Sequence, residues 1–97
     1  MTAALRSRAD VVTTTPERYA KQLVSHLGRK ATFEIDGPTS TVQLGSATGQ
    51  IVVGDGVITL LASGTDNEGV ELVEHVLGSH LERFGGRDEL AVSWERS

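Results

Sequence analysis

The sequence contains no cysteine and only four aromatic residues among its 97 positions. The absence of cysteine excludes disulfide bonds, thiolate catalysis and cysteine-ligated zinc sites, and it favours a reducing, cytoplasmic location. With so few aromatic side chains, the core must come mainly from Val, Leu, Ile and Ala, and hydrophobic residues make up 38% of the chain. A chain of this length is expected to form one domain over residues 1–97, and homodimerisation would be a natural supplement to so small a core.

Positive charge is also scarce. Nine Lys and Arg residues face thirteen Asp and Glu residues, which leaves a net charge of -4. This balance opposes the phosphate contacts that dominate nucleic-acid binding, so no nucleic-acid partner is expected. No apolar run approaches the length of a membrane helix, and residues 1–10 lack the apolar segment of a signal peptide. Membrane association is therefore not expected either.

Alternating polar and apolar residues, together with turn signals, predict the secondary structure. Thr15 is the expected N-cap of a helix that starts at Pro16, and a Gly-Asp-Gly turn at 54–56 predicts a tight hairpin. A further turn is expected at 45–49. The predicted strands are 6–13, 31–36, 39–44, 50–53, 57–62 and 89–95, and the predicted helices are 16–28 and 66–84. The order β-α-β-β-β-β-α-β favours an α+β two-layer sandwich, with a mostly antiparallel sheet and both helices on one face.

The two predicted helices share a five-residue pattern near their ends. Residues 25–29 and 79–83 both read Ser-His-Leu-x-Arg. The repeat suggests a duplicated strand-helix-strand unit related by a pseudo-twofold axis. Convergent composition at helix ends is the alternative, and the sequence does not decide between them.

His26 and His80 fall on the apolar stripes of the two helices, so both are predicted to point inward and to approach each other near the helix C-terminal ends. A positively charged imidazole is favourable at such an end. Three roles stay open for the pair: buried side chains bonded to backbone carbonyls, ligands for a metal or small molecule, and catalytic groups.

The remaining candidates carry weaker patterns. Glu71 and His75 have the i, i+4 spacing of helical metal ligands, but two ligands are too few and a solvated acidic face is preferred, so no metal site is predicted. Arg83 and Arg87 bracket the turn before the last strand, where either could hold a carboxylate. Trp94 is expected to anchor the core or an interface. No nucleophile or acid-base pair stands out, so no catalytic residue or cofactor is predicted and an enzyme is not the favoured reading.

Three motifs carry a family resemblance over nearly the whole chain. They are Tyr19-x-x-Gln22-Leu23-x-x-His26, Ala62 at the end of the central strand, and His80-Leu81-Glu82-Arg83-Phe84 followed by Arg87-x-Glu89-Leu90 and Trp94. The chain resembles the bacterial family known as domain of unknown function 2218. In place of Gly85-Gly86, the family has Ala-Phe, so an aromatic residue is missing here.

The resemblance implies a small α+β domain without an established activity, and a looser association of such domains with siderophore-interacting reductases implies iron handling. The family pattern also includes His26, His80, Arg83 and Arg87, and it adds Tyr19 and Trp94 as candidate functional residues.

The first functional hypothesis is a non-catalytic ligand-binding or interaction module that uses the open sheet face or the helix ends near His26 and His80. A small histidine-dependent enzyme or metal-binding protein is the first alternative. A structural homodimerisation domain that buries Trp94 and the sheet face is the second.

Overall fold

The computed structural model describes residues 4–86 and 89–97. Within them, six strands form one antiparallel sheet in the order β2-β3-β4-β5-β1-β6. The strands are β1 (Leu5–Val12), β2 (Phe33–Asp36), β3 (Thr39–Leu44), β4 (Ala47–Gly54), β5 (Val57–Gly64) and β6 (Glu95–Arg96). The strand predicted over 57–62 is central, as expected, because β5 lies between β4 and β1.

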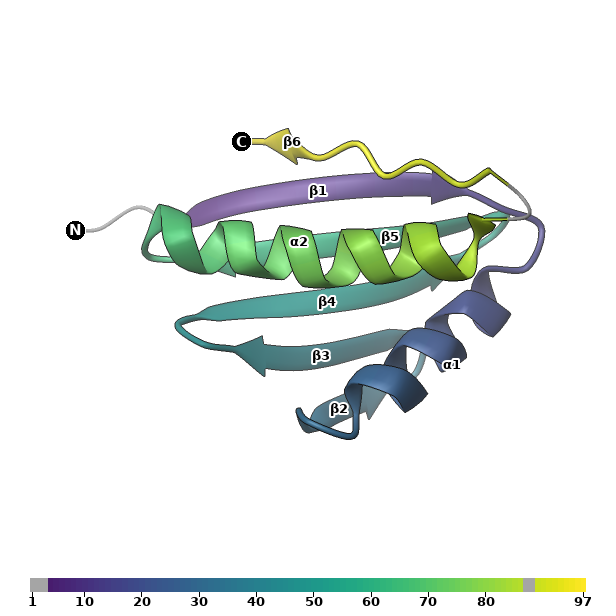
Figure 1. Cartoon of the computed structure of the whole chain (residues 1–97), viewed down its shortest axis with the longest axis horizontal. Helices are drawn as coiled ribbons and strands as arrows, with labels where there is room; N and C mark the ends of the chain where they lie inside the picture. The colour runs from purple at the N-terminus through teal and green to yellow at the C-terminus, as the bar shows by residue number, and fades with distance from the viewer. Residues whose placement is uncertain (1–3, 87–88) are drawn as a thin grey trace.

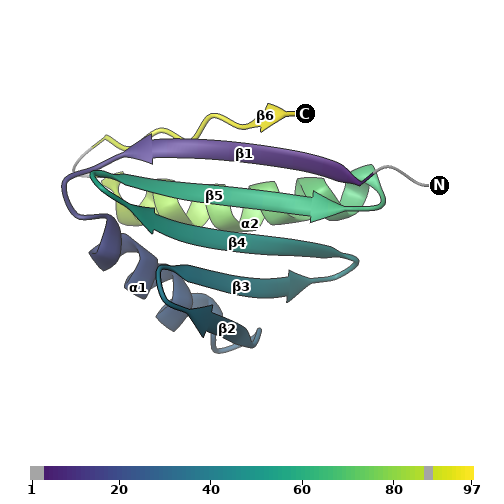
Figure 2. The same cartoon turned by 180° about the vertical axis from the view of Figure 1, so that it is seen from behind.

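Both helices, α1 (Pro16–Leu27) and α2 (Asn67–Phe84), cover the same face of the sheet (Figure 1). Seen from behind, the strands have no helix over them (Figure 2). The predicted α+β sandwich and its element order are therefore confirmed. Helix α2 runs almost along the strands, whereas α1 crosses them obliquely near β2 and β3. No helix in the described part of the chain has the length and hydropathy needed to cross a membrane.

Both helices begin within one residue of their predicted positions, but the expected cap of α1 differs. Pro16 occupies the first turn of α1 and Thr15 is its N-cap residue, yet the Thr15 side chain makes no cap hydrogen bond. Instead, the N–H of Thr15 donates to Oγ1 of Thr13 over 3.2 Å. In α2, Oδ1 of Asp66 accepts a hydrogen bond from the N–H of Gly69 at 2.6 Å, which is the usual role of an aspartate cap.

Helix α2 packs closely on β4 because Gly49 has no side chain. A Cβ atom at Gly49 would lie 3.0 Å from Cγ1 of Val73 and 3.1 Å from Cδ1 of Leu77. The predicted turn over 45–49 is therefore too long, since β4 already begins at Ala47 and Gly49 belongs to the strand. The largest side chains of the resulting core are aliphatic: Leu23, Ile51, Ile58, Leu60, Leu77 and Leu81.

The prediction of a closing strand over 89–95 is wrong for most of its length. Within the predicted range only Glu95 pairs with the sheet; it lies opposite Arg8 of β1, and the pairing continues with Arg96 opposite Ser7. The N–H of Ser97 then donates to the carbonyl of Arg6 at 3.1 Å. The three apolar side chains that alternate before Glu95 (Leu90, Val92 and Trp94) pack against the core, but the N–H of Val92 donates to Oε2 of Glu82 on α2 rather than to a strand. The alternation thus marks an extended segment that follows α2.

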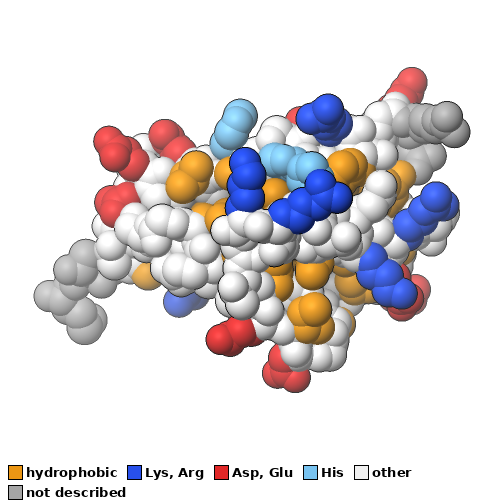
Figure 3. Space-filling view, turned by 60° about the horizontal axis from the view of Figure 1, so that its bottom comes forward, with side chains coloured by type: hydrophobic (Ala, Val, Ile, Leu, Met, Phe, Trp, Pro, Cys, Tyr) orange, Lys and Arg blue, Asp and Glu red, His pale blue; other side chains and the backbone are white. Residues whose placement is uncertain are grey.

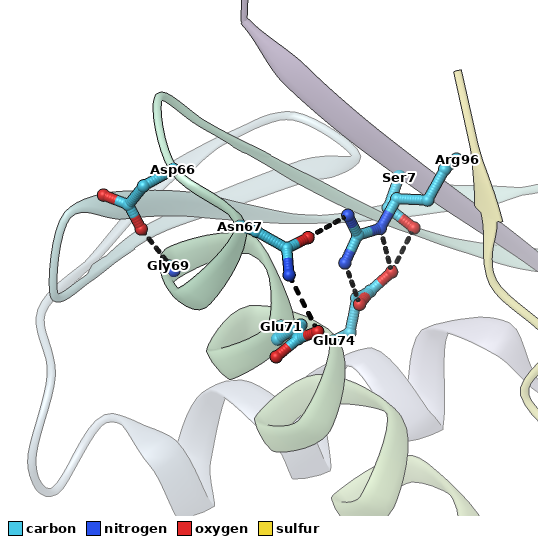
Figure 4. A network of polar contacts seen from close by, with 7 residues as sticks. All are labelled: Ser7, Asp66, Asn67, Gly69, Glu71, Glu74 and Arg96. Atoms are coloured by element: carbon cyan, nitrogen blue, oxygen red, sulfur yellow. Dashed lines mark hydrogen bonds and ion pairs between the residues drawn. The ribbon is translucent and has the colours of Figure 1, made fainter.

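A polar network holds the end of this segment (Figure 4). Arg96 donates to Glu74 of α2 through Nε (2.9 Å) and Nη2 (2.8 Å), and through Nη1 to Oδ1 of Asn67 (2.7 Å). Ser7 of β1 donates to Oε2 of the same Glu74 at 2.5 Å. The hydrogen bonds from Arg96 keep the pKa of Glu74 below its ordinary value, although partial burial acts in the opposite direction.

The two strand-helix-strand segments are not equivalent in the sheet. Three strands separate β1 from β2, whereas only β1 separates β5 from β6. The suggested duplication stays a prediction that gains no support from the strand order.

Candidate functional site

The two histidines of the repeated pattern meet at the surface. His26 lies in the last turn of α1 and His80 lies one turn before the end of α2. Their ring centroids are 5.1 Å apart, and the ring of Phe84 lies 5.5 Å from that of His26 in an edge-on arrangement. The predicted approach of the two imidazoles is therefore confirmed.

The prediction that both rings point inward is wrong for His26, which is exposed. The sheet-facing side of α1 is occupied by Tyr19, Ala20 and Leu23, so His26 projects from the flank that faces α2. His80 is half-buried, and its Nδ1 is 2.6 Å from the backbone oxygen of Val76. If Nδ1 carries the proton and donates to this carbonyl, Nε2 is left as the acceptor available to a ligand.

The histidine pair borders a groove of about 420 Å³. We call it the histidine groove and define it by its lining residues His26, Leu27, Arg29, Lys30, Ala31, Leu44, Val76 and His80. Its walls combine an apolar floor with four nitrogen-bearing side chains. No carboxylate is among these residues, in a chain whose net charge is -4. Figure 3 shows histidine side chains beside Lys and Arg side chains on one face of the molecule.

The turn after α1 places the two cations at the groove. The carbonyl of Leu27 accepts hydrogen bonds from the N–H groups of Lys30 (3.1 Å) and Ala31 (3.0 Å), so the chain folds back beside the helix end. Arg29 and Lys30 are exposed there. The backbone carbonyls at a helix C-terminus carry partial negative charge, which attracts these cations and partly offsets their field.

The other predicted site residues do not join this groove. Arg83 is exposed in the last turn of α2 and is not among the lining residues. Tyr19 belongs to the core cluster, with 7% of its surface exposed. Trp94 is half-buried against α2, where its Nε1 lies 2.9 Å from the position that a Cβ of Gly78 would take. Arg87 lies outside the described residues.

Glu71 and His75 lie on the opposite flank of α2. Both are exposed, and Oε1 of Glu71 accepts a hydrogen bond from Asn67 at 2.9 Å. Among residues 4–86 and 89–97, no three His, Asp or Glu side chains are grouped so that they could hold a metal ion.

The sequence reasoning did not place Arg29 and Lys30 at the histidine pair. The two residues form a short basic cluster three positions after His26, and this adjacency was the available signal. What could not be read from it is the turn back on Leu27, which brings both side chains to the groove.

Comparisons with known proteins agree with the resemblance seen in the sequence. Residues 8–95 match a family described as an uncharacterized protein conserved in bacteria, DUF2218. The fold is similar to that in the NMR structure of PA4090 from Pseudomonas aeruginosa, with a TM-score of 0.79 and 21% sequence identity over 94% of this chain and 95% of that one. At this identity the likeness concerns the fold alone. No functionally curated protein matches the sequence significantly.

Proposed function

The chain belongs to the uncharacterised bacterial family DUF2218, and we propose that it is a non-catalytic binding module for a small organic anion. The proposed site is the histidine groove. The observation that carries the proposal is the convergence of His26, His80, Arg29 and Lys30 on one groove with no acidic residue in its described lining.

The two parts of the groove define the class of ligand. The Arg29 and Lys30 side chains, together with an imidazole N–H of His26, are donors suited to carboxylate or phosphate oxygens. The floor formed by Leu27, Ala31, Leu44 and Val76 is apolar and suits a hydrocarbon or aromatic body. A carboxylate attached to a small ring or branched chain satisfies both parts.

Amide chemical shifts measured by NMR during a benzoate titration test the proposal. We expect saturable shifts at residues 26–31 and around His80, and much weaker shifts with benzamide, which has the same ring but no charge. His26→Gln and Arg29→Gln should each weaken benzoate binding roughly threefold or more, because each removes a donor to a charged oxygen.

Arg18→Gln is the matched control. Arg18 is exposed on the same helix as His26 but does not line the histidine groove, so its replacement should leave benzoate affinity unchanged. Equal affinities for benzoate and benzamide, or equal losses of benzoate affinity in all three variants, would refute a site that selects anions.

One observation favours a second candidate, a metal-binding or histidine-dependent protein. Two imidazoles with centroids 5.1 Å apart are close enough to share one metal ion. The neighbouring Arg29 and Lys30 disfavour a cation, so we rank this candidate below the anion site. Zinc in place of benzoate in the same titration separates the two: sharp shifts confined to His26 and His80, lost in His26→Gln, would favour the metal.

The proposal also extends to the location and the association state of the chain. We retain a cytoplasmic location from the absence of cysteine, and homodimerisation from the small core. A homodimer through the open sheet face would not use Trp94, because Trp94 packs beside α2. The link to iron or siderophore handling rests on the looser association alone.

A further inference from the structure

A second groove runs along the other flank of α1. It lies between this helix and the β2-β3 hairpin, and its volume is about 700 Å³. The sheet side is formed by Ile35, Pro38, Ser40 and Val53, and Ala20 and Val24 contribute from the helix. We call it the apolar groove. Its volume lies within the range of small-molecule sites in proteins, about 300–1,000 Å³.

The oblique course of α1 leaves this groove open. Ile51, Ser40 and Ile35 lie side by side on three adjacent strands, and all three face the helix layer. Exposure rises outward along this row, from 1% at Ile51 through 8% at Ser40 to 65% at Ile35. The helix layer therefore covers the β4 residue of this row but leaves its β2 residue largely uncovered. Figure 3 shows hydrophobic side chains at the surface below the cationic ones.

Ser40 adds a polar group to this apolar surface. Its hydroxyl makes no hydrogen bond to any described residue. In the described part of the chain, every fully enclosed side-chain nitrogen or oxygen has a hydrogen-bond partner, so the Ser40 hydroxyl is not fully enclosed. Since Ser40 lines the groove and is otherwise 92% covered, the hydroxyl opens into the groove. In the groove, the Ser40 hydroxyl is a hydrogen-bond donor that has no acceptor among the described residues.

The charges of the groove cancel. Glu17 and Lys21 are one turn apart on α1, and they are the charged residues in its lining. The apolar groove thus offers no net charge to a ligand, in contrast to the histidine groove. An ion that lost its hydration shell in this groove would have no net opposite charge to compensate it, so a neutral molecule fits better.

From these observations we infer that the apolar groove binds a neutral, largely hydrocarbon small molecule with one hydrogen-bond-accepting oxygen, such as a ketone or an ester. The hydrocarbon part covers Val24, Ile35 and Val53. The oxygen accepts the hydrogen bond from the Ser40 hydroxyl. This site shares no lining residue with the histidine groove, and the inference does not rest on the function proposed for that groove.

Fluorescence titration with prodan, a neutral naphthyl ketone whose emission shifts to the blue when it leaves water, tests the inference on the full chain. We expect a saturable blue shift. Ser40→Ala should weaken prodan binding by about 3- to 10-fold, the range for loss of one neutral hydrogen bond. The same variant should bind an alkylnaphthalene of matched size as tightly as the native chain does, which separates loss of the hydrogen bond from misfolding.

The second test variant places a charge in the lining of the apolar groove. Ile35→Glu should abolish prodan binding, whereas Val12→Glu should not, because Val12 is 81% exposed and is not among the lining residues. Prodan binding that survives Ile35→Glu, or that falls equally in both Glu variants, would place the probe elsewhere and overturn the inference. So would a native chain that associates with itself, measured by light scattering, and excludes prodan as it does so, because the occupant would then be a second copy.

Discussion

Arg96 donates two hydrogen bonds to the carboxylate of Glu74, from Nε to Oε2 at 2.9 Å and from Nη2 to Oε1 at 2.8 Å. This fork connects a strand of only two residues to the middle of α2. A two-residue strand has little backbone pairing of its own, so side-chain contacts carry much of its attachment. The Glu74 side chain is only 16% exposed, which makes this pair less screened than an ordinary surface ion pair.

The free energy of unfolding should decrease at acid pH because Glu74 becomes protonated. Its pKa is lowered in the folded state, chiefly by the hydrogen bonds from Arg96, so the folded chain binds the proton less readily than the unfolded chain does. The contribution is therefore fully present above the ordinary value of 4.5 and is lost as pH falls through the lowered folded pKa. Glu74→Gln should lower the free energy of unfolding by about 1 kcal/mol at neutral pH and flatten its dependence on pH in the acid range. Urea unfolding at several pH values measures both effects.

Asp10 has the same direction of shift and must be separated from Glu74. Its pKa is lowered by the hydrogen bond from Thr59 first and by that from Arg8 second. Asp10 is exposed on the sheet face, so some acid dependence should persist in Glu74→Gln. Glu34→Gln, at an exposed position of β2, is the control. An acid dependence identical in the native chain and in Glu74→Gln would contradict the assignment.

Gly85→Ala should destabilise the fold by about 1–3 kcal/mol through overpacking. A Cβ at Gly85 would lie 2.3 Å from Cδ1 of Leu90, although the backbone there, with φ of -91°, accepts alanine. Leu90 thus fills the space that a side chain at Gly85 would need. Adding Leu90→Ala should remove most of the extra cost, and chemical unfolding of both single variants and the double variant measures the coupling. Gly86→Ala is the control, because no atom of the described residues beyond its chain neighbours lies within 4 Å of the added Cβ.

Gly78→Ala should displace Trp94 without a large loss of stability. The added Cβ would lie 2.9 Å from Nε1 of Trp94 and 3.4 Å from Cγ1 of Val92. Alanine favours the helix by about 1 kcal/mol over glycine, which offsets the lost packing. Trp94 is the single tryptophan, so its emission should shift to the red as it becomes more exposed. Unchanged emission in a folded variant would show that Trp94 does not pack on Gly78.

His80→Gln should cost more stability than His26→Gln. His80 is half-buried and bonded to the Val76 carbonyl, so its loss should lower the free energy of unfolding by about 1 kcal/mol. His26 is exposed, and its replacement should stay within about 0.5 kcal/mol. Thermal unfolding of the two variants compares them. Equal and large losses would mean that the pair is a packing unit rather than a surface for a ligand.

The fold was largely predictable because its signals are local. The Gly-Asp-Gly turn and Pro16 each act within a few residues and mark element ends. The last strand was mispredicted because alternation shows which side chains face the core and does not show what the backbone pairs with. At Val92 the partner is a glutamate of α2.

The site was predictable only in part. Helical spacing located His26 and His80 on their helices, but it carries no information on how α1 crosses the sheet. That angle decides the exposure of His26 and the opening beside Ser40. The contact between Arg96 and Glu74 joins residues 22 positions apart, and no local pattern signals it.

Helix α1 forms one side of both grooves. One of its flanks borders the histidine groove and the other borders the apolar groove, and the helix is only twelve residues long. A rigid displacement of α1 that narrows one groove would widen the other. Binding of a ligand in one groove would then change the affinity of the other groove for its ligand, without contact between the two ligands. Thermodynamic reciprocity then requires each to alter the affinity of the other by the same factor.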